Sequence, residues 1–193
     1  MRYPKEHKSR TRQRIVETAA KAFRAKGLDG VGVADLMAEA GLTHGGFYAH
    51  FDSKEALIEA ACRHGIEATI DTLDFRARAA PPGEGLRTLV RAYLSRSHRD
   101  DAARGCIMPS LAGEIARREP ATRQVVTEQL RRLVDVIARH LPDLDAAARE
   151  RRALAVAASL VGAIALARAV DDAAVSDAIL EATRAFVLDS ARP

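Results

Sequence analysis

The clearest structural signal in the sequence comes from residues 33–50, which read VADLMAEAGLTHGGFYAH. Apolar side chains recur with helical spacing over 33–40, and the turn Gly41-Leu42 follows them. Residues 43–50 then form a second short segment with helical potential. Two short helices joined by a tight turn that contains glycine describe a helix-turn-helix. We therefore predict that the second helix enters the major groove of DNA by its N-terminal residues.

The second of these helices lies in a segment that is unusually rich in aromatic residues. Residues 43–51 hold three of the eight aromatic side chains in the chain. Phe47 and Phe51 are spaced i, i+4, which places them on one face of a helix. We expect both rings to pack into a small N-terminal core together with Ile15, Phe23, Leu36 and Leu57.

Helical periodicity continues along the whole chain, and no strand-like alternation interrupts it. Ser9 or Thr11 is placed to cap the first helix, and Asp52 with Glu55 has capping-box spacing for the fourth. The prediction is an all-α fold of about nine helices. We expect them at about 9–26, 33–40, 43–50, 53–79, 84–99, 107–118, 121–140, 145–169 and 172–189.

Charge is distributed unevenly. Residues 1–26 carry nine Lys and Arg against two Glu, a balance of +7, whereas the whole chain carries only +4. A basic arm indicates an anionic partner, either nucleic acid or a membrane surface. A membrane is disfavoured because 1–14 lacks an amphipathic apolar face, and because the apolar run 153–167 is short for a span of roughly 20 residues. The N-terminus has no apolar signal segment, so we expect a cytoplasmic protein.

The sequence contains no set of residues that predicts an enzyme, a cofactor or a metal site. Cys106 with His98, and Ser110 with Glu114, do not form a nucleophile, base and orienting group. Phosphate-loop and metal-ligand spacings are also missing. Cysteine occurs only twice, which is too few for a disulfide framework.

At this point the chain resembles the TetR family of transcriptional regulators. The resemblance covers residues 12–61, about a quarter of the chain. It is carried by a combination of positions, namely Gly41, Leu42, Gly46, Tyr48, His50, Phe51, Lys54 and Leu57. It implies a DNA-binding domain over 1–52 and a helical effector-binding and dimerisation domain over 53–193. It further implies a homodimer, most often a repressor, that a small hydrophobic effector releases from a palindromic operator on double-stranded DNA.

The resemblance also implies roles for particular residues. Thr43 and His44 would meet phosphate or base edges, and Gly45 would allow close approach of the backbone. Tyr48, His50 and Lys54 would reach phosphates, and the basic arm would add contacts from residues such as Arg12. The plainer alternative is that the two histidines are ordinary surface residues and that Tyr48 only packs.

The second half would hold the effector pocket and the dimer interface. The expected lining residues are Phe75, Leu89, Tyr93, Leu94, His98, Cys106, Met108, Leu111 and Ile164. Any of them could instead be plain core. The last two helices would pair with their two-fold mates through Ala158, Gly162, Ala165, Ile179 and Phe186, unless this face packs only within the chain.

Cys106 has a second interpretation. It follows Gly105 near an expected helix start, and Arg104 adds positive charge, which together predict a lowered thiol pKa. A Gly-Cys pair here also resembles that of family members that respond to oxidants or electrophiles. The alternative is a buried cysteine that behaves as a small hydrophobic residue.

Overall fold

The computed structural model describes residues 5–142 and 144–190, and every regular element in these ranges is helical. The all-α prediction is therefore confirmed, with nine α-helices and one short 3-10 helix in the described residues. In chain order they are α1 (Lys5–Lys26), α2 (Val33–Glu39), the 3-10 helix η1 (His44–Ala49), α3 (Lys54–Arg78), α4 (Gly85–Tyr93), α5 (Arg96–Asp100), α6 (Met108–Ile115), α7 (Pro120–Ala138), α8 (Ala146–Ala169) and α9 (Ala173–Ser190).

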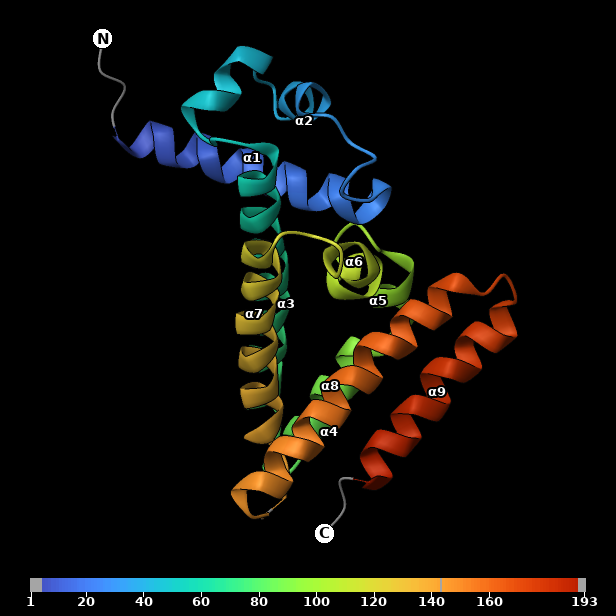
Figure 1. Cartoon of the computed structure of the whole chain (residues 1–193). Coiled ribbons are helices and arrows are strands. Elements are labelled where there is room, and N and C mark those ends of the chain that lie inside the picture. Colours follow the sequence, from blue (N-terminus) through green and yellow to red (C-terminus); the bar gives the residue numbers. More distant parts are fainter. Residues whose placement is uncertain (1–4, 143, 191–193) are drawn as a thin grey trace.

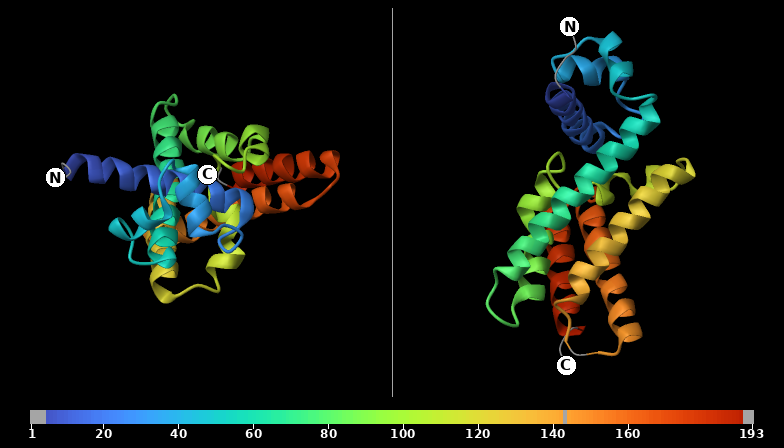
Figure 2. Two further views of the ribbon diagram at one scale, coloured as in Figure 1. Left: turned by 90° about the horizontal axis from the view of Figure 1, so that it is seen from above. Right: turned by 90° about the vertical axis from the view of Figure 1, so that its left-hand side faces the viewer.

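The helices form a small head and a larger body (Figure 1). Helices α1, α2 and η1 gather at one end, and α3 runs from them into the body beside α7. Helices α8 and α9 make an antiparallel hairpin that packs on α7 and α4 (Figure 2). Helix α3 therefore belongs to both parts and connects them.

The head is held together by the predicted aromatic core. All six residues expected there are at most 3% exposed, namely Ile15, Phe23, Leu36, Phe47, Phe51 and Leu57. The turn between α2 and η1 depends on Gly41, whose φ of +68° lies in the left-handed region. This conformation lets the Leu42 N–H donate to the Met37 carbonyl at 2.8 Å, which closes α2.

The predicted recognition helix differs from expectation, because it is a 3-10 helix rather than an α-helix. Its hydrogen bonds span three residues, from the Gly46 N–H to the Thr43 carbonyl and from the His50 N–H to the Phe47 carbonyl. Two adjacent glycines cost roughly 1 kcal/mol each in an α-helix, so the segment has little intrinsic tendency to extend into one. Thr43 is the N-cap residue, but its side chain makes no capping bond.

Two predicted helix starts are wrong. The first helix begins at Lys5, so Ser9 and Thr11 lie inside it and do not cap it. The N-cap of α3 is Ser53 rather than Asp52, because the Ser53 Oγ accepts the Ala56 N–H at 3.1 Å.

The helix expected over 84–99 is divided into α4 and α5. The chain leaves helical geometry at Leu94, where ψ is 38°. The Ser95 Oγ then accepts the His98 N–H at 3.2 Å and starts a new helix. This break turns the Ser95–His98 segment toward α3, where it becomes one wall of the cavity described below.

Candidate nucleic-acid interface and effector cavity

The recognition segment η1 is anchored by one ring and exposes the other. Phe47 is 1% exposed, and its ring stacks on that of Phe51 at a centroid distance of 5.8 Å. Tyr48 contacts Phe47 edge-on at 5.3 Å, yet 68% of Tyr48 remains exposed. Phe47 therefore fixes the segment to the core, while Tyr48 keeps its hydroxyl free for an external partner.

The residues at the start of η1 form an open surface. Thr43, His44 and Gly45 are all exposed. A Cβ built on Gly45 would meet no atom within 4 Å, whereas one on Gly46 would meet Met37 at 3.7 Å. The backbone at Gly45 can therefore approach a flat partner closely, and Gly46 faces α2.

Basic groups from α1 border this surface. The Arg12 guanidinium lies 4.5 Å from the centre of the Phe51 ring, a cation–π contact that orients it. Burial, followed by the charges of Lys8, Arg12 and His7, lowers the pKa of His50. The buried His50 Nδ1 has no hydrogen-bond partner among the described atoms. Lys54 is half-buried at the first position of α3. The structure thus brings Arg12 and His50 together beside η1.

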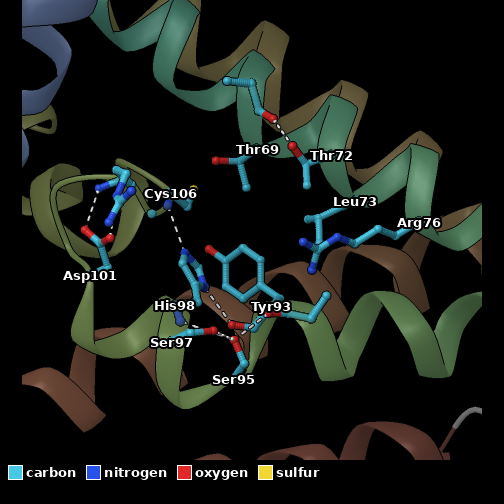
Figure 3. A pocket seen from close by; sticks show the side chains of 14 residues that line it. Thr69, Thr72, Leu73, Arg76, Tyr93, Ser95, Ser97, His98, Asp101 and Cys106 are labelled. Carbon is cyan, nitrogen blue, oxygen red and sulfur yellow. Dashed lines mark hydrogen bonds and ion pairs between the residues drawn. The ribbon is translucent and has the colours of Figure 1, made fainter.

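A cavity of about 400 Å³ lies in the body between α3, α4, α5 and the loop that precedes α6 (Figure 3). We call it the α3–α4 cavity. Three of the predicted lining residues are present, Tyr93, His98 and Cys106. The remaining wall is Ala68, Thr69, Thr72, Leu73, Arg76, Ala92, Ser95, Ser97, Asp101, Arg104 and Gly105.

The other residues expected to line a pocket lie elsewhere. Phe75 is 74% exposed and points away from the body, because it falls on the opposite side of α3 from the buried positions. Leu89, Leu94, Leu111 and Ile164 are fully buried core residues that do not line the cavity. Met108 is partly buried against the same core. The prediction concentrated on apolar residues, whereas most of the residues that line the cavity carry polar side chains. Thr69, Thr72 and Arg76 have i, i+3, i+7 spacing, a pattern that could have revealed them in the sequence.

His98 organises the inner wall of the cavity. Its Nε2 accepts the Cys106 N–H at 2.8 Å, so its Nδ1 carries the proton and donates to the Tyr93 carbonyl at 2.6 Å. Burial is the main cause that lowers the pKa of His98. The imidazole is therefore neutral near pH 7, and it joins α4 to the loop before α6.

Cys106 contradicts the predicted lowered pKa. The residue is 2% exposed, and burial raises the pKa of its thiol. The opposing influences of the Tyr93 hydroxyl, the Met108 N–H, Arg24 and Arg168 are smaller. The loop encloses the thiol before α6 begins at Met108, so desolvation outweighs any effect of the helix N-terminus. Burial likewise raises the pKa of Cys62, to about 12.

Three contacts join the head to the loop before α6, to α6 itself and to the residues just after it. The Arg24 Nη1 in α1 donates to the Ala103 carbonyl at 3.1 Å, within the loop before α6. The Leu28 N–H donates to the Glu114 Oε2 of α6 at 2.8 Å. Arg118, just after α6, pairs with Asp29 at 2.6 Å. The loop and α6 are therefore physically attached to the end of α1.

The hairpin of α8 and α9 leaves an apolar face uncovered. The exposed residues include Leu154, Leu166, Val175 and Phe186, the last at 68%. Ala158 is exposed, a Cβ on Gly162 would meet nothing within 4 Å, and Ala165 is half-buried. Ile179 differs from this group because it packs partly against the core. Length and composition alone would allow α8 to cross a membrane, but a core helix of a soluble protein passes the same test, and one such helix does not indicate a membrane protein.

Known proteins share both parts of this architecture. The family described as bacterial regulatory proteins, tetR family, matches residues 15–61. The tetracyclin repressor-like C-terminal domain matches residues 82–183, more than half of the chain.

Individual relatives agree with these matches. The HTH-type transcriptional regulator YerO of Bacillus subtilis (strain 168) is 31% identical over 94 residues, which cover 46% of this chain and 32% of YerO. The chain thus spans about a third of that relative's length. The HTH-type transcriptional repressor DhaR of Mycobacterium sp. (strain GP1) is 28% identical over 123 residues, which cover 62% of this chain and 58% of the DhaR sequence.

A solved structure extends the likeness to nearly the whole fold. The structure of a TetR-family transcriptional regulator from Cytophaga hutchinsonii superposes on this one with a TM-score of 0.76 and 26% sequence identity. The superposition covers 95% of this chain and 96% of the Cytophaga chain. Members of this family are helix-turn-helix transcription regulators and not enzymes. The chain belongs to the TetR family of bacterial regulatory proteins.

Proposed function

We propose that the chain is a homodimeric repressor that binds a palindromic operator and leaves it when a small molecule occupies the α3–α4 cavity. The observation that carries this proposal is the contact of Arg24 in α1 with Ala103, which lies in the same loop as the lining residues Gly105 and Cys106. The proposed division is a DNA-binding domain over 1–52 and an effector and dimerisation domain over 53–193. The protein would act in the bacterial cytoplasm, where its operator lies.

In this proposal the DNA surface is built from η1 and its basic border. His44 and Thr43 face the base edges or phosphates, and Gly45 allows the backbone to enter the groove. Tyr48, His50, Lys54 and Arg12 bind phosphates. Such contacts orient the protein on the duplex, and they make its affinity depend steeply on salt.

Dimerisation follows from the uncovered face of α8 and α9. Leu166 and Phe186 are both at least 60% exposed, and large apolar side chains gathered on one face indicate an interaction surface. A two-fold dimer would bury this face against itself and would present two η1 segments to two half-sites. Ala158, Gly162 and Ala165 would let the helices of the two protomers approach closely.

Release requires that a ligand stabilises an arrangement in which the two η1 segments no longer match the operator. The cavity wall includes Gly105 and Cys106, in the same loop as Ala103. A ligand that displaces this loop therefore also displaces the carbonyl that holds Arg24. Coupling of roughly 1–3 kcal/mol would change operator affinity about 5–150-fold.

The DNA surface is tested by replacing Tyr48 and Lys54 together with Ala. We expect the operator affinity, measured by fluorescence anisotropy on a duplex selected from a random library, to fall about a hundredfold. Each lost contact to a charged group contributes roughly 1.5–3 kcal/mol, and 1.4 kcal/mol is a factor of ten. The slope of affinity against salt should also become shallower.

The matched control removes one exposed aromatic ring and one exposed cation far from η1. Phe75→Ala with Arg91→Ala should leave operator affinity and salt slope unchanged. Light scattering should show the same oligomer in all three proteins. If Tyr48→Ala with Lys54→Ala binds the operator as tightly as the control does, η1 is not the DNA surface.

A thiol switch at Cys106 is the second candidate function, and burial makes it the weaker one. A buried thiol with a raised pKa forms little of the thiolate that oxidants attack. We therefore expect hydrogen peroxide to leave the operator complex intact, equally in the natural protein and in Cys106→Ser. Release of the natural protein by peroxide, with Cys106→Ser still bound, would establish the thiol switch instead.

A further inference from the structure

We infer that the α3–α4 cavity binds a small organic carboxylate with a short apolar body, rather than a neutral hydrophobic molecule. This inference names the effector class of the proposed repressor, and its link to operator release rests on that proposed function. The cavity has an excess of positive charge and, among the described residues, one buried hydroxyl without a hydrogen-bond partner.

The charged groups that line the cavity leave a positive excess. Asp101 is the acidic residue in the lining, and its carboxylate is already paired with Arg104 at 2.6 Å. Arg76 extends from α3 toward the cavity (Figure 3). Arg76 is exposed, and within residues 5–142 and 144–190 it has neither an ion pair nor a hydrogen bond. His98 adds no charge because its imidazole is neutral. An anion would therefore provide the counter-charge that Arg76 lacks.

Two further guanidinium groups stand behind the inner wall. Arg24 donates to the Ala103 carbonyl, and Arg168 donates from Nη2 to the His98 carbonyl at 2.7 Å and from Nε to the Arg99 carbonyl at 2.9 Å. A Cβ on Gly105, a lining residue, would come within 3.0 Å of the Arg168 Nη2. The hydrogen-bond partners of both arginines in the described part of the chain are carbonyl and hydroxyl oxygens, and neither forms an ion pair there. Burial lowers the pKa of both, but a guanidinium remains charged in proteins. Both guanidinium groups therefore add positive charge behind the inner wall, which the carboxylate of Asp101 offsets in part.

The threonine hydroxyls of α3 and the Ser95 hydroxyl already donate their hydrogens within the protein. Thr69 and Thr72 use their hydroxyl hydrogens on the Gly65 and Ala68 carbonyls of their own helix. Ser95 donates to the Ala92 carbonyl at 2.9 Å.

The Tyr93 hydroxyl, in contrast, belongs to a residue only 1% exposed, and it has no hydrogen-bond partner among the described atoms. The neighbouring Cys106 thiol influences its pKa, but the two groups do not adopt hydrogen-bond geometry. Burial, followed by that thiol, raises the pKa of Tyr93 well above its usual value, so the hydroxyl stays a donor. A ligand oxygen is the acceptor that this donor lacks.

The rest of the lining suits a short apolar body. Ala68, Leu73 and Ala92 share the cavity with the Tyr93 ring. A volume of about 400 Å³ lies at the small end of the range for ligand pockets, which is roughly 300–1,000 Å³. An extended hydrophobic ligand would have to cover the polar groups of Ser95, Ser97 and Thr69 without pairing with them.

The test measures binding of matched acids and amides by isothermal titration calorimetry. The probes are benzoate and the straight-chain carboxylates from acetate to octanoate, each compared with its primary amide at pH 7. We expect at least one carboxylate to bind, and its amide, which has nearly the same shape but no charge, to bind at least tenfold more weakly.

Three variants locate the site. Arg76→Gln should weaken the bound carboxylate at least tenfold, and Tyr93→Phe, which keeps the ring, should weaken it about threefold or more. Arg78→Gln is the matched control, because it removes an exposed arginine on the same helix outside the cavity and should leave binding unchanged. The inference is overturned if no carboxylate in the series binds, if acids and amides bind equally, or if Arg78→Gln and Arg76→Gln lose the same affinity.

The same carboxylate is then added to the operator complex. The carboxylate could bind, and lose affinity in Arg76→Gln and Tyr93→Phe, without releasing the DNA. That result would support the ligand class and contradict the proposed effector function. If the protein binds its operator but binds no carboxylate, the inferred ligand class is overturned, whereas the proposed DNA binding stands.

Discussion

Phe47→Ala should lower the free energy of unfolding by about 3–5 kcal/mol, the usual cost of deleting a buried phenylalanine ring. Phe47 is 1% exposed and contacts Phe51 and Tyr48, so its loss opens a cavity under η1. A 3-10 helix of six residues has no independent stability, and removal of its anchor should release the whole segment. Urea denaturation followed by circular dichroism measures the change.

Tyr48→Ala is the control for this prediction, because it removes the adjacent ring, which is 68% exposed. It should alter the free energy of unfolding by less than about 1 kcal/mol while weakening operator binding. Equal destabilisation by the two substitutions would contradict the division of η1 into a buried anchor and an exposed DNA contact.

Phe186→Asp should convert the proposed dimer into a monomer and raise its dissociation constant about a hundredfold or more. Phe186 is 68% exposed on the uncovered face of α8 and α9. Burial of such a side chain contributes roughly 1.5–3 kcal/mol, and a two-fold interface contains it twice. The introduced carboxylate would also have to be desolvated. Analytical ultracentrifugation over a concentration series measures the constant, and operator affinity should fall with it.

Phe75→Asp is the matched control, since Phe75 is 74% exposed but lies on α3. It should leave the dimer intact. The proposed interface on α8 and α9 would be contradicted by either of two results. One is a monomeric Phe75→Asp protein, and the other is a Phe186→Asp protein that remains a dimer at the same concentrations.

The head of the molecule could be predicted from sequence in some detail because its signals are local. Phe47 and Phe51 are large apolar residues four positions apart next to a glycine turn, and the expectation that both are buried is confirmed. The order and type of the later helices were also predictable, since Gly105, Pro120 and Pro142 interrupt the periodicity. The division between α4 and α5 was missed because it depends on one serine, Ser95, which caps a new helix.

The cavity was less predictable because it is made by tertiary contacts. Cys106 looked like a thiol near an exposed helix start, but the enclosing loop buries it and reverses the expected shift of its pKa. Thr69 and Arg76 carry no sign of their role without α4 and α5 packed opposite them. Phe75 is a large apolar residue of the kind that lines pockets, but its position on α3 faces the solvent.

The most direct test of the account is to select DNA from a random duplex library with the full chain and to sequence the bound fraction. We predict enrichment of a palindrome whose two half-sites are related by two-fold symmetry and separated by about one or more helical turns. Tyr48→Ala with Lys54→Ala should lose this enrichment. Absence of any enriched sequence, or enrichment of a single asymmetric site that the double variant still selects, would contradict a dimeric repressor that reads DNA through η1.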